Sequence, residues 1–175
     1  FDISGDSLYA GVWGSNANYD GASGEFDIYI GLTKDFGPIS MDFGVVHYDY
    51  PGNSSLNTED VYLISGFKSF ELGIYQTTSA DWFGEQDAAG TQYIYGAYTL
   101  ELNETISAGF SYGQTIVSGD GNDTLDYTDT KTSIAFPLFG TDIELAYTTT
   151  SYDTPASDPG ATADSRFIVS VSKAL

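Results

Sequence analysis

The sequence predicts an all-β protein, an antiparallel up-and-down transmembrane β-barrel formed by one domain over residues 1–175. Three observations indicate this fold. Apolar residues recur at every second position in one run after another. Several runs are about 10 residues long, which suits a tilted strand that crosses a membrane. The connections between the runs alternate between short and long.

The alternation has the period of a strand, and no segment of useful length has the 3.6-residue period of a helix. Phe26, Ile28 and Ile30, for example, alternate with polar residues. Successive side chains of a strand point to opposite faces, so each run has one apolar face and one face of polar or small residues. This pattern predicts ten strands, over residues 7–14, 25–34, 38–49, 60–67, 70–78, 91–101, 105–116, 126–137, 141–150 and 165–175.

The lengths of the connections predict which end of the barrel each one occupies. The short connections lie near residues 35–37, 68–69, 102–104 and 138–140, and the long ones cover 15–24, 50–59, 79–90, 117–125 and 151–164. In an up-and-down barrel, alternate connections lie at the same end. Bacterial outer-membrane barrels have short periplasmic turns and long extracellular loops. We therefore expect a location in the bacterial outer membrane, with the long loops outside and the short turns and the C-terminus in the periplasm.

The first residues indicate that more chain precedes them. Residues 3–6 have the composition of a short turn, and Phe1 and Asp2 read as the end of a descending strand. A descending strand in this topology needs an ascending partner. The sequence thus predicts residues upstream of Phe1 and twelve strands in the intact barrel.

Composition excludes several classes of function. The chain has 25 acidic and 5 basic residues, a formal charge of −20, and no cysteine. Disulfides, thiolate metal sites and cysteine nucleophiles all require thiols. A charge of this sign repels nucleic-acid phosphates, so no nucleic-acid partner is expected. No apolar run reaches the 18 residues of a transmembrane helix.

Several motifs resemble those of the TorF family, whose members are proposed to be porins. The similar segments are residues 8–16 (LYAGVWGSN), 25–31 (EFDIYIG), 45–52 (VVHYDYPG), 80–84 (ADWFG) and 165–173 (SRFIVSVSK). The chain lacks the N-terminal strand pair of that family, and it ends in Leu175 where an aromatic residue is usual. The resemblance implies an outer-membrane pore, and it supplies no substrate and no catalytic residues.

If the apolar face meets lipid, the polar face lines the lumen. The pore-lining residues predicted on that basis are Asp27, Asp42, Glu71, Lys131, Asp142 and Glu144. Rings of carboxylates attract cations, so these residues predict a cation-preferring channel for passive diffusion of small solutes. The same carboxylates suit a closed lumen if they bond to Lys131, tyrosines and serines, because small barrels fill their interior with side chains.

The glycines and tyrosines assigned to the inward face are compatible with an open or a closed lumen. Gly73 and Gly96 leave space, and Tyr75 and Tyr98 fill it. Other aromatic residues gather near the strand ends, as expected of the two interfacial belts of a membrane barrel.

Neither catalysis nor a metal or cofactor site is predicted. His47 is the only histidine, and it shares the parity of Phe43 and Val45, so we expect it at the lipid interface. No G-x-S-x-G motif accompanies it. The acidic loop 120–126 lacks the ligand spacing of an EF-hand calcium site, and it is interpreted, like residues 153–164, as a solvated loop.

Three functions remain open on the sequence. The first is the cation-preferring outer-membrane pore. The second is a closed structural or adhesive barrel that acts through its long acidic loops. The third is a soluble ligand-binding barrel of the lipocalin type, in which the apolar face would point inward. The partners expected of the first two are outer-membrane lipid and lipopolysaccharide, small solutes or cations, and a second copy or another outer-membrane protein.

Overall fold

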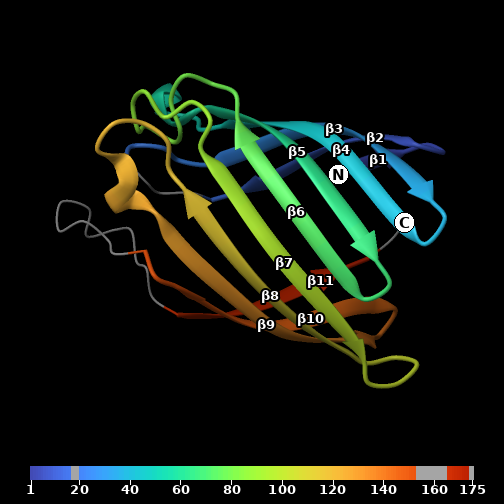
Figure 1. The fold of residues 1–175 in the computed structure, drawn as a ribbon. Helices are drawn as coiled ribbons and strands as arrows, with labels where there is room; N and C mark the ends of the chain where they lie inside the picture. Colours follow the sequence, from blue (N-terminus) through green and yellow to red (C-terminus); the bar gives the residue numbers. More distant parts are fainter. Residues whose placement is uncertain (17–19, 153–164, 174–175) are drawn as a thin grey trace.

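A computed structural model, which describes residues 1–16, 20–152 and 165–173, shows one antiparallel sheet of 11 strands. Every strand pairs with its neighbours in the sequence, so the order is β1 to β11 without a crossover (Figure 1). The described residues contain no α-helix. The strands are β1 (Asp2–Ser4), β2 (Leu8–Ser15), β3 (Glu25–Phe36), β4 (Ile39–Asp49), β5 (Thr58–Phe67), β6 (Phe70–Thr77), β7 (Gln92–Glu101), β8 (Ser107–Ile116), β9 (Tyr127–Leu138), β10 (Thr141–Thr150) and β11 (Arg166–Ser172).

The ten predicted strands correspond to β2–β11, and the predicted strand stub corresponds to β1. Most boundaries differ from the prediction by no more than about two residues, which is the usual uncertainty at an element's end. The predicted last strand ran to residue 175, and residues 174–175 lie outside the described part of the chain. The prediction of an all-β, up-and-down antiparallel fold is confirmed.

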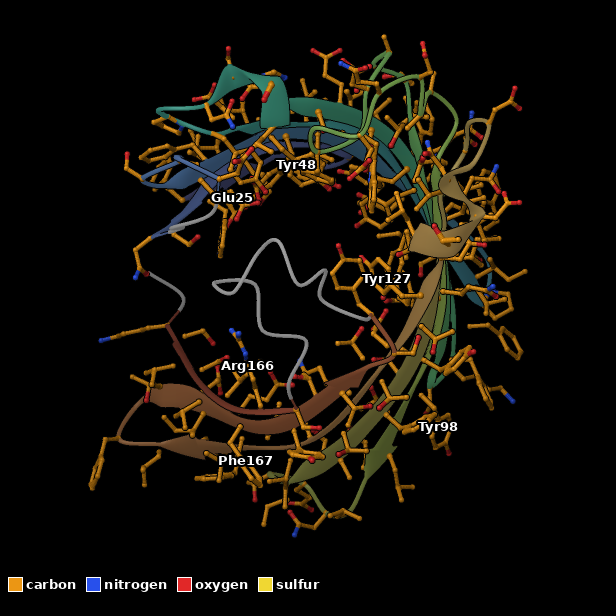
Figure 2. The ribbon with its side chains drawn as sticks, turned by 90° about the vertical axis from the view of Figure 1, so that its left-hand side faces the viewer. Glu25, Tyr48, Tyr98, Tyr127, Arg166 and Phe167 are labelled. Carbon is orange, nitrogen blue, oxygen red and sulfur yellow. The ribbon has the colours of Figure 1, made fainter. Side chains whose placement is uncertain are left out.

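The sheet curls around a central space but is not closed. Described pairings join β1 only to β2 and β11 only to β10. Figure 2 shows the curled sheet with these two edge strands on either side of the opening. A closed barrel and a total of twelve strands therefore stay predictions.

The connections alternate in length as the sequence predicts. Residues 5–7, 37–38, 68–69, 102–106 and 139–140 make the short turns, and they gather at one end of the sheet (Figure 1). The other end carries the long loops, two of which contain short 3₁₀ helices, η1 (Ser54–Leu56) and η2 (Asn122–Leu125). In the two-residue turn at 139–140, both residues have positive φ, 52° and 75°, which matches the right-handed twist of the adjoining strands.

The outer face of the sheet is apolar and exposed. Ile28, Phe43 and Leu145 are 55%, 53% and 42% exposed, respectively. Figure 2 shows Phe167 pointing away from the central space, whereas Tyr127 points into it. The predicted orientation, with apolar side chains outside, is confirmed. An apolar surface of this extent is what a membrane-spanning strand requires, and it is unusual on a soluble protein.

Two residues assigned to the inner face lie on the outer face instead. Tyr98 pairs with Phe70 and Phe110, and Gly96 pairs with Leu72. Figure 2 shows Tyr98 outside the sheet. The assignment was wrong because β7 has aromatic residues on both parities, so its own pattern does not indicate which face is apolar. The register with β6 and β8 decides it.

Inward tyrosines lie across glycines of the neighbouring strand. Gly31 faces Tyr9, and Gly44 faces Tyr62. In the same way, Gly73 on β6 faces Tyr95 on β7. A methyl group added at any of these glycines would overlap the facing tyrosine ring. The glycines thus make room for large rings to lie flat on the inner wall. A glycine in a strand is otherwise destabilising, so close packing is the reason it suits these positions.

Fully buried side chains concentrate under the long loops. Leu56, Ala88 and Val117 come from three different loops, and each is almost inaccessible to solvent. Thr58 and Thr115, at the adjoining strand ends, are equally buried. The compact core of this fold therefore lies at the long-loop end of the sheet rather than along its length.

We predict that Gly73→Ala destabilises the folded protein by about 1–3 kcal/mol, because the new methyl group displaces the Tyr95 ring. Gly96→Ala is the matched control on the neighbouring strand, since its methyl group would make an ordinary 3.4 Å contact with Leu72. Urea unfolding of both variants in detergent micelles measures the difference. Equal stabilities for the two variants would contradict this packing.

Candidate functional site

The inner face carries most of the residues predicted to line a pore. Asp42 accepts hydrogen bonds from Tyr9 at 2.8 and 2.9 Å. Glu71 accepts one from Tyr95 at 2.7 Å. Both carboxylates lie on the inward parity of their strands, β4 and β6, as the sequence predicts.

Lys131 and Glu144 form an ion pair across β9 and β10, with 2.8 Å between Nζ and Oε1. In the register Lys131 lies opposite Thr148, which is four residues from Glu144 on the same face. The long lysine side chain therefore extends along the inner face to reach Glu144. Asp142 has the parity of Glu144 and lies nearer the short-turn end, opposite Pro137. No contact of its side chain joins it to the other predicted residues within the described chain.

Asp27 differs from Asp42 and Glu71, because no hydroxyl group donates to its buried Oδ1 atom among the described residues. It lines a cavity of about 300 Å³ on β3 together with Tyr29 and Tyr62. Its Oδ1 atom is buried and has no hydrogen-bond partner among the described residues. Burying a polar atom without a partner is costly, so this oxygen is a candidate contact for a solute or ion.

Four further carboxylates on or beside the inner face were not among the predicted residues. Tyr29 donates to Asp2, Tyr50 to Glu25 at 2.6 Å, Tyr93 to Asp129 at 3.2 Å, and Thr77 to Asp60 at 2.8 Å. Parity alone could have found Asp60 and Asp129, because both alternate with outward residues in runs that the sequence already assigns to strands. The hydroxyl partners could not be found, since each comes from a different strand.

Tyr50 lies just beyond β4 in the long-loop region. Burial raises the pKa of its hydroxyl above the usual range, and the hydrogen bond to Glu25 adds to the shift. The hydroxyl therefore stays protonated and remains a donor over the physiological pH range.

The inner face has few compensating positive charges. Among the described residues, Lys131 and Arg166 are the basic side chains on the inward parity. Figure 2 shows Arg166 on the inner side of the sheet, across the central space from Glu25. Among the described residues of the inner wall, carboxylates outnumber these two bases, which gives this part of the wall a net negative charge.

A cavity of about 780 Å³ lies within the curl of the sheet. Residues of all seven strands from β4 to β10, inclusive, line it, and loop 78–91 completes the wall. Tyr48 and Tyr75 belong to this wall and also to that of the smaller cavity beside Asp27. The two cavities therefore adjoin each other along the inner face.

Loop 78–91 packs against strand ends at the long-loop end of the sheet and contributes to the wall of the larger cavity. The Phe83 ring makes edge contacts with Tyr48 and Tyr50, at centroid distances of 5.2 and 5.9 Å. The Phe83 amide donates to Thr58 Oγ1 at 2.8 Å. Trp82 lies against the same ring, at 5.4 Å. We call this segment the cap loop; the sequence indicated a long loop here but not that it turns inward.

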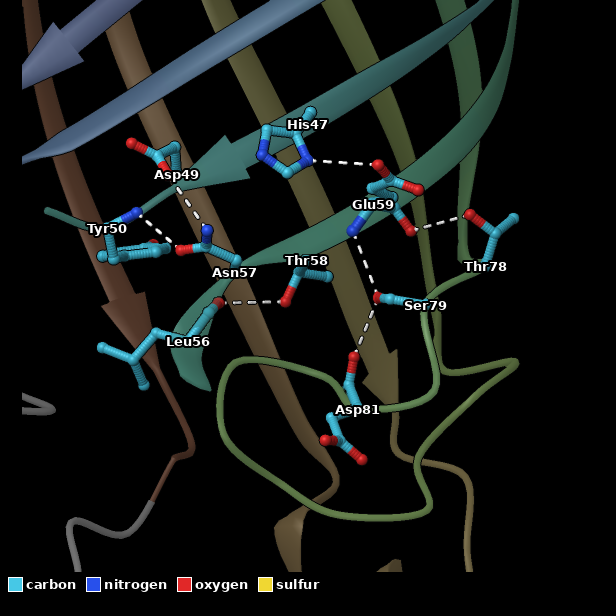
Figure 3. A network of polar contacts seen from close by, with 10 residues as sticks. All are labelled: His47, Asp49, Tyr50, Leu56, Asn57, Thr58, Glu59, Thr78, Ser79 and Asp81. Atoms are coloured by element: carbon cyan, nitrogen blue, oxygen red, sulfur yellow. Dashed lines mark hydrogen bonds and ion pairs between the residues drawn. The ribbon is translucent and has the colours of Figure 1, made fainter. Parts of the chain in front are cut away.

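The base of the cap loop is held by the strand ends (Figure 3). Ser79 Oγ accepts a bond from the Glu59 amide at 3.2 Å and donates to the carbonyl oxygen of Asp81 at 2.9 Å. On the outer side of the same strands, His47 Nδ1 lies 3.2 Å from Glu59 Oε1. His47 thus lies on the outward parity, where the sequence places it, and away from the cavities.

The acidic loop 120–126 uses its polar groups to shape itself. Asp126 Oδ1 accepts from the Val117 amide at 2.7 Å, and Asn122 donates to the Ser118 carbonyl at the same distance. Within the described ranges, no group of three or more His, Asp or Glu side chains is placed to hold a metal ion. The acidic residues 153–164 lie outside the described part of the chain. No described helix has the length and hydropathy to cross a membrane.

A family model described as "Bacterial protein of unknown function (Gcw_chp)" matches residues 1–175. Searches of curated proteins and of solved structures found no match. The match carries no statement about activity, so the resemblance to the TorF family stays a prediction.

We predict that Phe83→Ala loosens the cap loop, because it removes the ring contacts with Tyr48 and Tyr50 that tie the loop to the sheet, together worth about 1–3 kcal/mol. The expected result is cleavage by a glutamyl endopeptidase at Glu85 that is about tenfold faster or more. Phe139→Ala, at an exposed position in a short turn, is the control and should cleave at the parent rate. An unchanged rate for Phe83→Ala would show that the ring does not hold the loop.

Proposed function

Because the chain belongs to the Gcw_chp family, whose description leaves function open, we propose from the structure that it is a cation-preferring conduit of the bacterial outer membrane. Small solutes would diffuse passively along its inner face. The observation that carries the proposal is the inner wall itself, where carboxylates greatly outnumber bases around cavities of about 780 and 300 Å³.

The outer face supports a membrane location. Large apolar side chains are exposed along successive strands, and a lipid environment satisfies such a surface whereas water does not. A sheet also needs its edges paired in lipid, because unpaired backbone groups are costly there. Under this proposal, the edges of β1 and β11 are closed in the membrane, either by further strands or by a partner.

The ends of the sheet support an orientation. Short turns gather at one end and long acidic loops at the other, which is the arrangement of outer-membrane barrels. The long loops would face outward, where their carboxylates would stay hydrated and concentrate cations near the mouth. Divalent cations would also link these carboxylates to lipopolysaccharide.

A lipocalin-type soluble barrel is disfavoured by the same orientation. That function needs an apolar inner face, and here the inner wall carries tyrosines, carboxylates and hydroxyls. The apolar residues that would line such a ligand site lie on the outside.

We predict that the folded protein conducts ions in a planar bilayer and that its reversal potential in a salt gradient indicates cation preference. Asp42→Asn with Glu71→Gln should lower that preference, because it removes two inward charges and keeps both tyrosine hydrogen bonds. Glu59→Gln, an outward carboxylate beside His47, is the control and should leave selectivity unchanged. Folded protein without any conductance would reject the conduit.

A second candidate is a closed structural or adhesive barrel that acts through its long loops. The cap loop favours it, since Trp82 and Phe83 form part of the wall of the larger cavity and Phe83 is held there by Tyr48 and Tyr50. On this alternative, the cap is permanent and the acidic loops form the working surface.

Replacing residues 79–90 with a short Gly-Ser turn distinguishes the two. If the cap limits flow, single-channel conductance should rise at least about twofold while cation preference persists, since the carboxylates remain. If the barrel is closed along its length, conductance stays absent in the shortened protein as well. Circular dichroism of the strand signal confirms that the shortened variant is folded.

A further inference from the structure

We propose that the larger cavity is a binding site for small organic cations, with an ammonium or quaternary ammonium group as the recognised feature. The inference rests on the proposed conduit and names the class of solute that it would favour. It is carried by the combination of aromatic rings and carboxylates on one cavity wall.

Aromatic rings dominate the wall of this cavity. Tyr48, Tyr75, Tyr93, Tyr95 and Tyr127 contribute from four different strands, and the cap loop adds Trp82 beside Phe83. The ring faces of tyrosine and tryptophan attract cations, and quaternary ammonium groups are often held in cages of such rings. A hydrated inorganic ion gains little from this wall.

The tyrosines are arranged as a continuous series along the inner face. Tyr62 stacks on Tyr75 at 5.1 Å, Tyr75 lies 6.4 Å from Tyr93, and Tyr93 stacks on Tyr95 at 5.7 Å. Tyr62 lines the smaller cavity and Tyr95 the larger one. A cation with an apolar surface therefore finds ring contacts from one cavity to the next.

Three carboxylates complete the wall of the larger cavity. Asp129, Glu71 and Asp60 line it, and each accepts a hydroxyl hydrogen bond through one oxygen, Oδ1, Oε1 and Oδ1 respectively. These hydrogen bonds do not use the second oxygen of each group, so under this proposal an ammonium ion contacts that oxygen. No lysine or arginine belongs to the described wall, so nothing there neutralises these charges.

The chemistry of the wall excludes other solutes on physical grounds. An anion would meet three carboxylates without a base. A neutral apolar molecule would gain contact with the rings but would leave the carboxylates desolvated, which is costly. A divalent metal ion needs several oxygens at one point, and the described residues provide no such group. An organic cation satisfies both parts of the wall.

Choline and its neutral carbon analogue, 3,3-dimethylbutan-1-ol, test this selectivity, because they share shape and differ in charge. The reporter is Trp82 fluorescence of the full chain in detergent micelles, in a Trp13→Phe background that leaves Trp82 as the only tryptophan. Titrations are made at constant potassium chloride. We expect saturable binding of choline at least about tenfold tighter than binding of the neutral analogue.

Variants locate the binding. Glu71→Gln and Asp129→Asn should each weaken choline binding about fivefold or more, and Glu59→Gln, an outward carboxylate outside the cavity, should leave its affinity unchanged. Equal affinity for choline and the neutral analogue would overturn the inference, and so would equal losses in all three variants. If a variant fails to fold, the comparison of the two ligands on the parent chain still decides.

The failure of this inference is distinguishable from failure of the conduit. Conductance with cation preference but no choline selectivity would retain the conduit and reject the binding site. Selective choline binding without conductance would retain the site and reject the conduit.

Discussion

The alternation of side chains across the pleated sheet is the constraint on which the rest of this structure depends. Successive residues of each strand point to opposite faces. This alternation places Ile28, Phe43 and Leu145 outside, and it places Asp42 and Glu71 inside. A shift of one residue in any strand would exchange the two faces. The apolar exterior, the acidic interior and the cavities all follow from this register.

The inner wall meets two demands with the same residue type. Tyrosine rings fill space against facing glycines, and their hydroxyls satisfy carboxylates that the curl of the sheet would otherwise leave partly desolvated. Tyr9 and Tyr95 do both: they lie on Gly31 and Gly73 and donate to carboxylates on other strands. Packing of the inner wall and the proposed recognition of cations therefore involve one network of tyrosines and carboxylates.

Much of the fold and part of the site could be predicted from the sequence. Strand positions, loop ends and the inward parity of Asp42 and Glu71 follow from local periodicity and turn composition. The faces of Gly96 and Tyr98 could not be predicted from β7, because both of its parities carry aromatic residues. The long loop itself was predicted, but its contact with the inner wall was not, since that contact depends on the Tyr48 ring of β4, which lies far away along the chain.

The sequence by itself determined the all-β class, the strand order and which face of most strands is apolar, because these depend on neighbours along the chain and on a period of two. Only the tertiary structure decided which tyrosine meets which carboxylate, that loop 78–91 lines the larger cavity, and that two cavities share a wall. These features join residues of separate strands at distances set by the curvature of the sheet. Curvature is a property of all the strands together, so no local pattern contains it.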